Sequence, residues 1–376
     1  MPVLHDLAIG QYFADVRDPR VDRTKDHALL DIIIIAICGV ICGADSWVEI
    51  EEFGNSKRAW LTTILDLPHG IPSHDTFGRV FARIDPKQFQ HSFLTWVQAL
   101  QQVRPNVIAI DGKTHRRSHD RAHGKAALHL ISAWAADNRL VLGQVAVDDK
   151  SNEITAIPQL LALLDLRACT VTIDALGCQT AIAEQIVQRG GQYVLALKGN
   201  QPTMLADVQS LFADARTALQ PAYGMTSATT VEKDHGRIET RRAFVISDPA
   251  ALQYLNERQH WAQLRSVALI EAERTVQETT TIEHRYYLLS QVLDAVTVNT
   301  LVHNHWRIEN QVHWVLDVSF HEDASRIRTG HAPANMAVLR HIALNLLRQE
   351  PSKGSLKTKR FRAALNDDYL AQVLGL

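Results

Sequence analysis

The sequence predicts an α/β fold in which a mixed sheet covered by helices follows a helical N-terminal unit. Two features of the apolar pattern along the chain predict this fold. DHALLDIIIIAICGVICGADSWVEIEEF and PKQFQHSFLTWVQALQQ carry the apolar spacing of helices. After residue 103 the chain changes to short β-rich runs, and helical patterns alternate with the later runs. Residues 1–103 are therefore expected to form a helical domain.

Five short runs predict the strands of the sheet. They are VIAID (107–111), AALHLISAW (126–134), RLVLGQVAV (139–147), TVTID (170–174) and QYVLAL (192–197). ITAIPQLLALLDL, with a proline near its start, and GCQTAIAEQIVQR predict helices before the fourth and fifth strands. The order βββαβαβ implies strands that are antiparallel at first and parallel afterwards, which is the order of a ribonuclease-H-like fold. Residues 104–198 are predicted to be the first part of this core.

The remainder of the chain divides into three segments. Residues 199–294 contain strand-like stretches such as RRAFVIS and LRSVALIEAER, and predict a β-rich insertion. Residues 295–350 carry two helices, at about 296–320 and 332–349, that are expected to complete the core. Residues 351–376 are predicted to be a basic C-terminal tail.

Composition places the chain among ordinary globular proteins, with 46% hydrophobic residues and a net charge of −2. The longest apolar run, 32–42, is too short to cross a membrane, and the N-terminus lacks the pattern of a secretory signal. A cytoplasmic location is expected. The four cysteines show no metal-ligand spacing and are expected to be reduced and mostly buried.

Basic residues gather in two short segments. Residues 113–125 hold five Lys or Arg against one Asp, and residues 351–362 hold five against none. Each segment suits contact with phosphates, although a single charge run is more simply explained as a solvated loop.

Two aspartates stand at the ends of predicted strands. Asp111 ends VIAID and Asp174 ends TVTID. The first and fourth strands are neighbours in a ribonuclease-H-like sheet, so both carboxylates are expected at one edge. Taken alone, either aspartate is more simply explained as a turn residue that accepts backbone N–H bonds.

A third carboxylate lies in a helical pattern. Helical spacing places Glu309 in a row with apolar residues and His305, which predicts a buried face. A buried ionised carboxylate requires a partner. A metal ion would serve, and so would an intrahelical pair with His305 or His313, or a salt bridge to an arginine.

Three carboxylates indicate a hard cation such as Mg²⁺, which prefers oxygen ligands. Two such ions about 4 Å apart can activate a water or a 3′-hydroxyl and stabilise the leaving oxygen in phosphoryl transfer. Gly112-Lys113-Thr114 ends like a nucleotide-binding loop, but Val107 replaces the glycine that such a loop requires. Zinc is disfavoured because HExxH is absent.

Many ordered segments resemble one family. They include HGIPSHDTFGRVF, IDGKTHRRS, AVDDKSNEITAIPQLL, VTIDALGCQTAIA, YVLALKGNQ, HGRIETR, HWRIENQVHWVLDVSFHEDASRIR and NMAVLRHIALNLL. Over nearly its whole length the chain resembles the H-repeat-associated DDE transposases of bacterial insertion sequences, within the ribonuclease-H-like transposase superfamily. In the superfamily's wider pattern Tyr, Arg and Lys stand where this chain has Val302, His305 and Leu316.

The resemblance implies a metal-binding catalytic triad of Asp111, Asp174 and Glu309. It implies two Mg²⁺ ions, for which Mn²⁺ is expected to substitute, cleavage at the element's ends, and attack of the freed 3′-hydroxyl on target DNA. The implied partner is double-stranded DNA, as terminal inverted repeats and target, bound by a homodimer at the bacterial nucleoid with no membrane partner. Candidate DNA contacts are Lys113, Arg116, Arg117, Lys198, His235, Arg237, His305, Arg307, Arg326 and Arg328.

Two other functions stay open at this point. A domesticated or inactive DNA-binding relative would keep the fold without the reaction. A metal-dependent nuclease would cut without strand transfer. The intact triad argues against the first, and the long insertion and basic C-terminal segment argue against the second.

Overall fold

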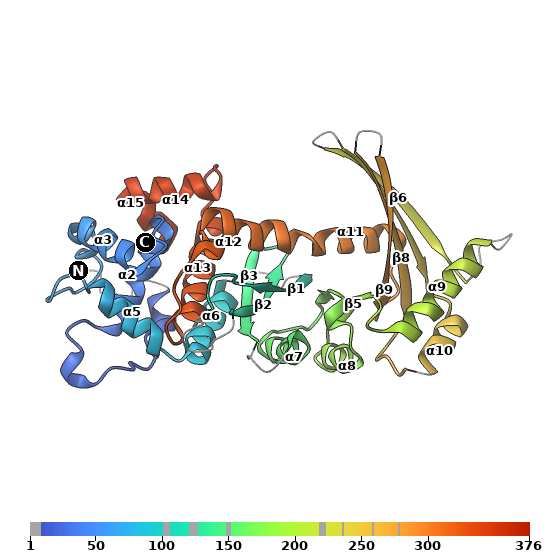
Figure 1. Cartoon of the computed structure of the whole chain (residues 1–376), viewed down its shortest axis with the longest axis horizontal. Coiled ribbons are helices and arrows are strands. Elements are labelled where there is room, and N and C mark those ends of the chain that lie inside the picture. The colour runs from blue at the N-terminus through green and yellow to red at the C-terminus, as the bar shows by residue number, and fades with distance from the viewer. Residues whose placement is uncertain are drawn as a thin grey trace.

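The computed structural model of the chain describes residues 9–100, 106–119, 127–147, 152–217, 223–234, 237–257, 259–276 and 279–376. The molecule is elongated, with a helical domain at one end, a β-sheet through the middle and a β-rich extension at the other end (Figure 1). The candidate chemistry lies where the sheet meets the helices that return from the extension.

The helical domain is built around α2. It contains α1 (Gly10–Phe13), α2 (Leu29–Cys42), α3 (Trp47–Ser56), α4 (Arg58–Leu61), α5 (His74–Arg83) and α6 (Pro86–Leu100). The side chains of α2 from 31 to 41 are buried, as expected of a helix that is apolar on all sides. Among the described residues, no single helix is long and apolar enough to cross a membrane; α2 and α3 pass that test together but are bent by 94°.

The C-terminus returns to this domain and corrects one prediction. α13 (Ala332–Gln349) packs against α2, and α14 (Leu356–Leu365) and α15 (Asp367–Leu374) follow it. Residues 351–376, predicted to be a basic C-terminal tail, are therefore largely helical and pack against the helical domain. Lys359 and Arg360 are buried, where Lys359 pairs with Glu350 at 3.1 Å and Arg360 lies over the Phe320 ring. A count of charges could not show that these side chains are buried.

Nine strands form one sheet in the order β3-β2-β1-β4-β5-β9-β8-β7-β6. β1 (Val107–Thr114), β2 (His129–Ala135) and β3 (Leu140–Ala146) are antiparallel, and β4 (Thr170–Ile173) and β5 (Gln192–Leu197) continue the sheet parallel to β1. The predicted strand directions, and the adjacency of the first and fourth strands, are confirmed.

The insertion extends this sheet instead of forming a separate one. β9 (Thr279–Leu289) pairs antiparallel with β5, and β8 (Ser266–Val276), β7 (Arg237–Ile246) and β6 (Thr226–Asp234) follow. Two helices also lie in this segment, α9 (Pro202–Thr217) and α10 (Pro249–Glu257), which the prediction of a β-rich insertion did not include. Buried side chains at 204, 208, 212 and 215 show the helical spacing of α9.

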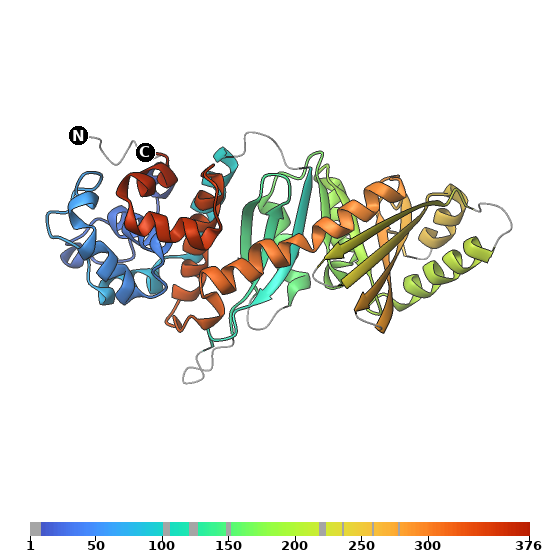
Figure 2. The same cartoon turned by 90° about the horizontal axis from the view of Figure 1, so that it is seen from above.

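Helices cover both faces of the sheet. α7 (Glu153–Leu163) and α8 (Thr180–Gln188) lie on one face, and α11 (Ala295–His305) crosses the other. Seen from above, α11 and the chain after it run diagonally from the extension to the helical domain (Figure 2). This path carries residues 305–320 past the ends of β1 and β4.

Candidate active site

Asp111 and Asp174 lie where the pairing between the parallel strands β1 and β4 ends, although β1 itself continues to Thr114, beyond the end that the sequence predicts for it. Ile110 of β1 is in register with Ile173 of β4, so the residue that follows each of them is an aspartate at the same edge of the sheet. This is the arrangement that the sequence predicts for the two carboxylates.

Asp111 is held in its ionised form. The Gly112 N–H donates to Oδ1 at 2.9 Å, and Nε2 of His313 lies 3.3 Å from Oδ2. Burial opposes ionisation, but the interactions with His313, His305 and the Gly112 N–H outweigh it and lower the pKa of Asp111. A negative charge is thus maintained at the edge of β1.

Asp174 has the opposite electrostatic environment. Its Oδ1 accepts from the N–H groups of Leu176 at 3.1 Å and Gly177 at 3.4 Å, which is the turn role considered for an isolated aspartate. Burial, and then the charges of Glu153 and Asp111, raise its pKa above the ordinary value. Like charges therefore crowd this edge, and a cation bound there would relieve the repulsion.

Glu153 is an acidic neighbour that the sequence analysis missed. It begins α7, and its Oε1 lies 2.6 Å from Nε2 of His129, whose Nδ1 is 2.6 Å from the Thr114 hydroxyl. The only sequence signal was an acidic residue at the start of a helix. Sequence could not show that this helix begins beside Asp174.

Gly112 is required by this packing. A Cβ at this position would lie 2.4 Å from Oε1 of Glu153 and 2.9 Å from Nε2 of His129. Gly112→Ala is expected to displace Glu153 and to lower stability by about 1–3 kcal/mol, the usual cost of overpacking. Urea denaturation measures it, with Gly199→Ala as control because a Cβ there meets nothing within 4 Å. Equal losses in both variants would contradict the close contact.

Glu309 is exposed, so the prediction that it lies on a buried face is wrong. The helix changes to a π-helical segment at Glu309–His313 before α12 (Trp314–Ser319). A π-helical turn shifts the angular position of the side chains, and here Ile308, Val312 and His313 are buried. Burial therefore does not require a metal ion as a partner for the Glu309 carboxylate.

Two histidines place the helix of Glu309 over Asp111. His305, four residues before Glu309, interacts electrostatically with Asp111 and lies 2.9 Å from the Thr172 hydroxyl through Nδ1. His313, four residues after it, lies beside the Asp111 carboxylate. The backbone of Glu309 is thus between two residues directed at the strand ends, and its side chain faces solvent, from which a substrate would approach.

A divalent ion fits this site only as part of a larger ligand set. Among the residues that the structure describes, no group of three or more His, Cys, Asp or Glu side chains is gathered to hold a metal ion. Mg²⁺ does not need such a cage, because it retains waters and commonly uses one or two carboxylates together with substrate phosphates. Asp111 and Asp174, crowded and acidic, suit that mode of binding.

The predicted DNA contacts fall into three groups. Lys113 is committed to ion pairs with Asp317 and Glu322, so its prediction as a free phosphate contact is wrong. His305 is bonded to Thr172, with burial lowering its pKa, and Arg328 donates to the Arg117 carbonyl at 3.0 Å. His235 and the Arg237 side chain lie outside the described residues. Five candidates are exposed: Arg116, Arg117, Lys198, Arg307 and Arg326.

Comparison with known sequences identifies the family. The domain described as "Transposase DDE domain" matches residues 103–346, and the domain described as "DDE_Tnp_1-associated" matches residues 10–97. The chain belongs to the DDE transposase family. The nine-stranded sheet and the aspartate pair lie within residues 103–346, the part of the chain that this domain matches.

Two curated relatives are named as putative transposases, one of them as H repeat-associated. The chain is 40% identical to the putative transposase YncI of Escherichia coli O157:H7, covering 97% of this chain and 93% of the relative. It is 37% identical to the H repeat-associated putative transposase YhhI of Escherichia coli K12, covering 97% of each. The solved piggyBac transposase synaptic complex with hairpin DNA has a TM-score of 0.40 at 9% identity, over 98% of this chain and 77% of that one.

Proposed function

We propose that this DDE transposase family member binds the ends of an insertion sequence and catalyses metal-dependent DNA cleavage and strand transfer. The observation that carries the proposal is the aspartate pair where the pairing of β1 with β4 ends, with Asp111 and Asp174 side by side under the helix of Glu309. We further propose that β1 to β5, completed by residues 295–350, are a ribonuclease-H-like core.

In this proposal Asp111, Asp174 and Glu309 hold Mg²⁺. When bound, two such ions, or Mn²⁺ in their place, activate the attacking oxygen and stabilise the leaving one. The chain's own contribution is to keep Asp111 ionised through His313 and to present Glu309 from the solvent side. The exposure of Glu309 implies that its ligand role is completed only when DNA occupies the site.

Double-stranded DNA, both terminal inverted repeat and target, would reach the site past the exposed cations. Arg116 and Arg117 follow β1, Lys198 follows β5, and Arg307 and Arg326 flank the helix of Glu309. These exposed cations come from several elements of the chain, as phosphate contacts along a duplex that passes the aspartate pair would require. A homodimer would hold two ends at once.

The test is cleavage and strand transfer on labelled DNA that carries the element's own end, with Mg²⁺ or with EDTA. Glu309→Ala is expected to lower the cleavage rate at least about 10²-fold, because it removes a ligand of the reacting ions. Glu52→Ala, an exposed carboxylate on α3, is the matched control and is expected to cut normally.

The outcomes separate the three candidate functions. Mg²⁺-dependent cutting and joining that is lost only in Glu309→Ala supports the transposase. DNA binding without any product under any divalent metal favours a non-catalytic relative, and cutting without joining favours a nuclease. If Glu309→Ala still cuts at the normal rate, Glu309 is not a ligand.

A further inference from the structure

Lys113 lies two residues after Asp111 and on the same face of β1. Its side chain is 12% exposed, and its Nζ donates to Asp317 and, at 2.9 Å, to Glu322 Oε2. It also donates to the backbone carbonyl of His313 at 3.3 Å. Lys113 thus contacts three residues in the segment that follows Glu309 in the sequence.

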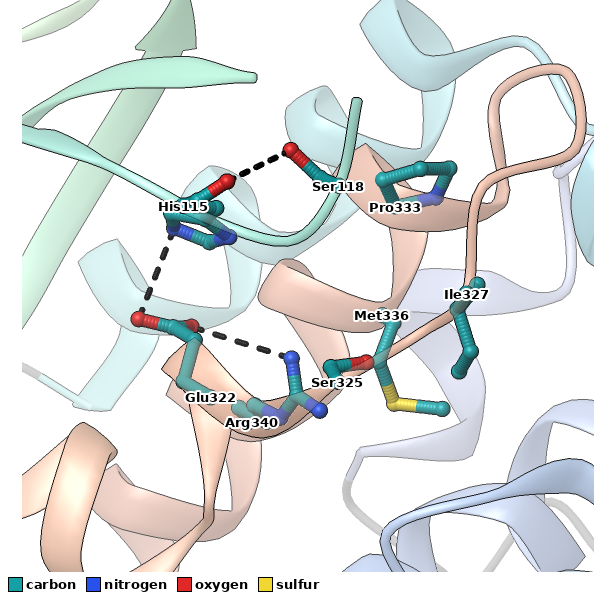
Figure 3. Close-up of a pocket in the computed structure, with 8 residues that line it drawn as sticks. All are labelled: His115, Ser118, Glu322, Ser325, Ile327, Pro333, Met336 and Arg340. Atoms are coloured by element: carbon teal, nitrogen blue, oxygen red, sulfur yellow. Dashed lines mark hydrogen bonds and ion pairs between the residues drawn. The ribbon is translucent and has the colours of Figure 1, made fainter. Parts of the chain in front are cut away.

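Glu322 is the centre of a buried charge network. Its side chain is 1% exposed, and Nε2 of His115 and a guanidinium nitrogen of Arg340 lie 3.4 Å and 3.9 Å from its oxygens (Figure 3). Burial opposes its ionisation, but the charges of His115, Lys113 and Arg340 hold the pKa of Glu322 well below its usual range. The carboxylate is therefore ionised and compensated.

The cavity beside this network is too small for a substrate. Its volume is about 10 Å³, which is about the space of one water molecule, and Ser118, which lines it, donates a hydrogen bond of 2.8 Å to the His115 carbonyl. A charge cluster in a wall this closely packed cannot receive DNA. Its role must lie in what it holds together.

The network joins the strand of Asp111 to the helix of Glu309. Asp317 belongs to α12, His313 ends the π-helical segment that begins at Glu309, and Glu322 lies in the short 3₁₀ turn Glu322–Ala324 after α12. His313 contacts two residues of β1: its ring lies beside Asp111, and its carbonyl accepts from Lys113. Fixing these points fixes where Glu309 stands relative to Asp111.

We propose that Lys113 is a positioning residue, which uses Asp317, Glu322 and the His313 carbonyl to hold the Glu309 segment against the Asp111 strand. The inference rests on the proposed function, because it concerns the spacing of that triad. It assigns Lys113 a role other than phosphate contact. Buried ion pairs contribute little to stability but can specify one arrangement of the chain, which here is the Glu309 segment held against the Asp111 strand.

The test maps the ion site in the folded protein with the element's end bound, because the ligand role of Glu309 is completed on DNA, and it does not use the protein's activity. Fe²⁺ replaces Mg²⁺, and ascorbate with peroxide then generates hydroxyl radicals that cut the backbone near the bound ion. The wild-type protein is expected to be cut near Asp111, Asp174 and Glu309. Lys113→Met is expected to keep the first two cuts and to lose most of the third.

Two further variants make this result specific. Lys113→Arg keeps the charge and is expected to restore part of the third cut, although its planar group cannot reproduce all three bonds. Lys57→Met is the control, since Lys57 pairs with Asp367 at 2.5 Å in the helical domain. If Lys113→Met does not fold, the half-buried Asp317→Asn provides the same test from the other side of the ion pair.

DNA binding separates positioning from phosphate contact. Lys113→Met is expected to bind the element's end within about twofold of wild type with an unchanged salt dependence, while single-turnover cleavage falls about 10²-fold. A phosphate contact would instead weaken binding and reduce the salt slope by about one. That result would overturn the proposal.

The remaining outcomes distinguish the two proposals. Wild-type cuts near all three residues that persist unchanged in Lys113→Met overturn the positioning role alone. A wild-type protein that is cut at neither aspartate overturns the metal site, and the positioning role with it.

Discussion

Asp174→Asn is expected to reduce single-turnover DNA cleavage by at least about 10³-fold while binding of the element's end changes less than about twofold. The carboxylate follows β4 next to Asp111, at the place where the proposed ions would bridge DNA and protein. Loss of a ligand to a catalytic ion removes several kcal/mol of transition-state stabilisation, and each 1.36 kcal/mol is about tenfold in rate. Quenched-flow cleavage and filter binding measure the two quantities.

The same variant is expected to be more stable than wild type in EDTA. Because the folded protein raises the pKa of Asp174 above its model-compound value of 3.8, ionising this group destabilises the fold. Its contribution to stability is complete below that value and is lost as pH rises through the folded pKa. At neutral pH the amide avoids this cost, so the melting temperature of Asp174→Asn should exceed that of wild type.

Mg²⁺ should reverse that order, because it binds the folded wild-type site and stabilises it by mass action. The variant should respond little. Asp26→Asn, which changes an exposed carboxylate outside the site, is expected to match wild type in every measurement. An Asp174→Asn protein that melts below wild type in EDTA and still gains stability from Mg²⁺ would contradict the crowded-carboxylate account.

The strands and the aspartate pair were predictable because their signals are local. β-rich runs of five or six residues mark the strands, and the order of elements then makes the first and fourth strands neighbours. Sequence did not show that β1 continues past Asp111 to Thr114, nor that Ile110 pairs with Ile173, because the order of elements does not set the register.

Glu309 was misplaced because its neighbours were read with a single helical period. The predicted row is buried on both sides of Glu309, at Val302 and Val312, but where the π-helical segment begins Ile308 takes the buried position and Glu309 faces solvent, a local change without a distinct sequence signal. Lys113 and Glu153 were misjudged for another reason. Their partners, Glu322 and Asp174, are far away in sequence, and a charge in a loop-like run looks the same whether it meets water or a buried carboxylate.

Glu322→Ala is expected to lower the free energy of unfolding by about 3–5 kcal/mol at neutral pH, the cost of breaking a buried ion pair from one side. It would remove this counter-charge from the buried Arg340 and leave Lys113 paired with Asp317 alone of its two carboxylates. Urea denaturation measures the loss. Glu52→Ala, on the surface of α3, is expected to change stability by less than about 0.5 kcal/mol.

The free energy of unfolding lost on removing the Glu322 charge should depend on pH. Since the folded protein lowers the pKa of Glu322, its contribution is complete above the model-compound value of 4.5 and is lost as pH falls from there toward the folded value. The difference in stability between wild type and Glu322→Gln should therefore shrink in acid. A constant difference between pH 7 and pH 4 would mean that packing, and not charge, accounts for it.

Removing both Lys113 and Glu322 separates the interaction between these two residues from the interactions that each makes with other residues. Lys113→Met combined with Glu322→Gln leaves no uncompensated charge between these two residues, so it should be more stable than the sum of the single losses predicts. If the double variant regains stability but still fails to cleave DNA, the ion network serves the placement of Glu309 more than the stability of the fold. Additive losses would show instead that Lys113 and Glu322 act independently, because a shared ion pair requires coupling.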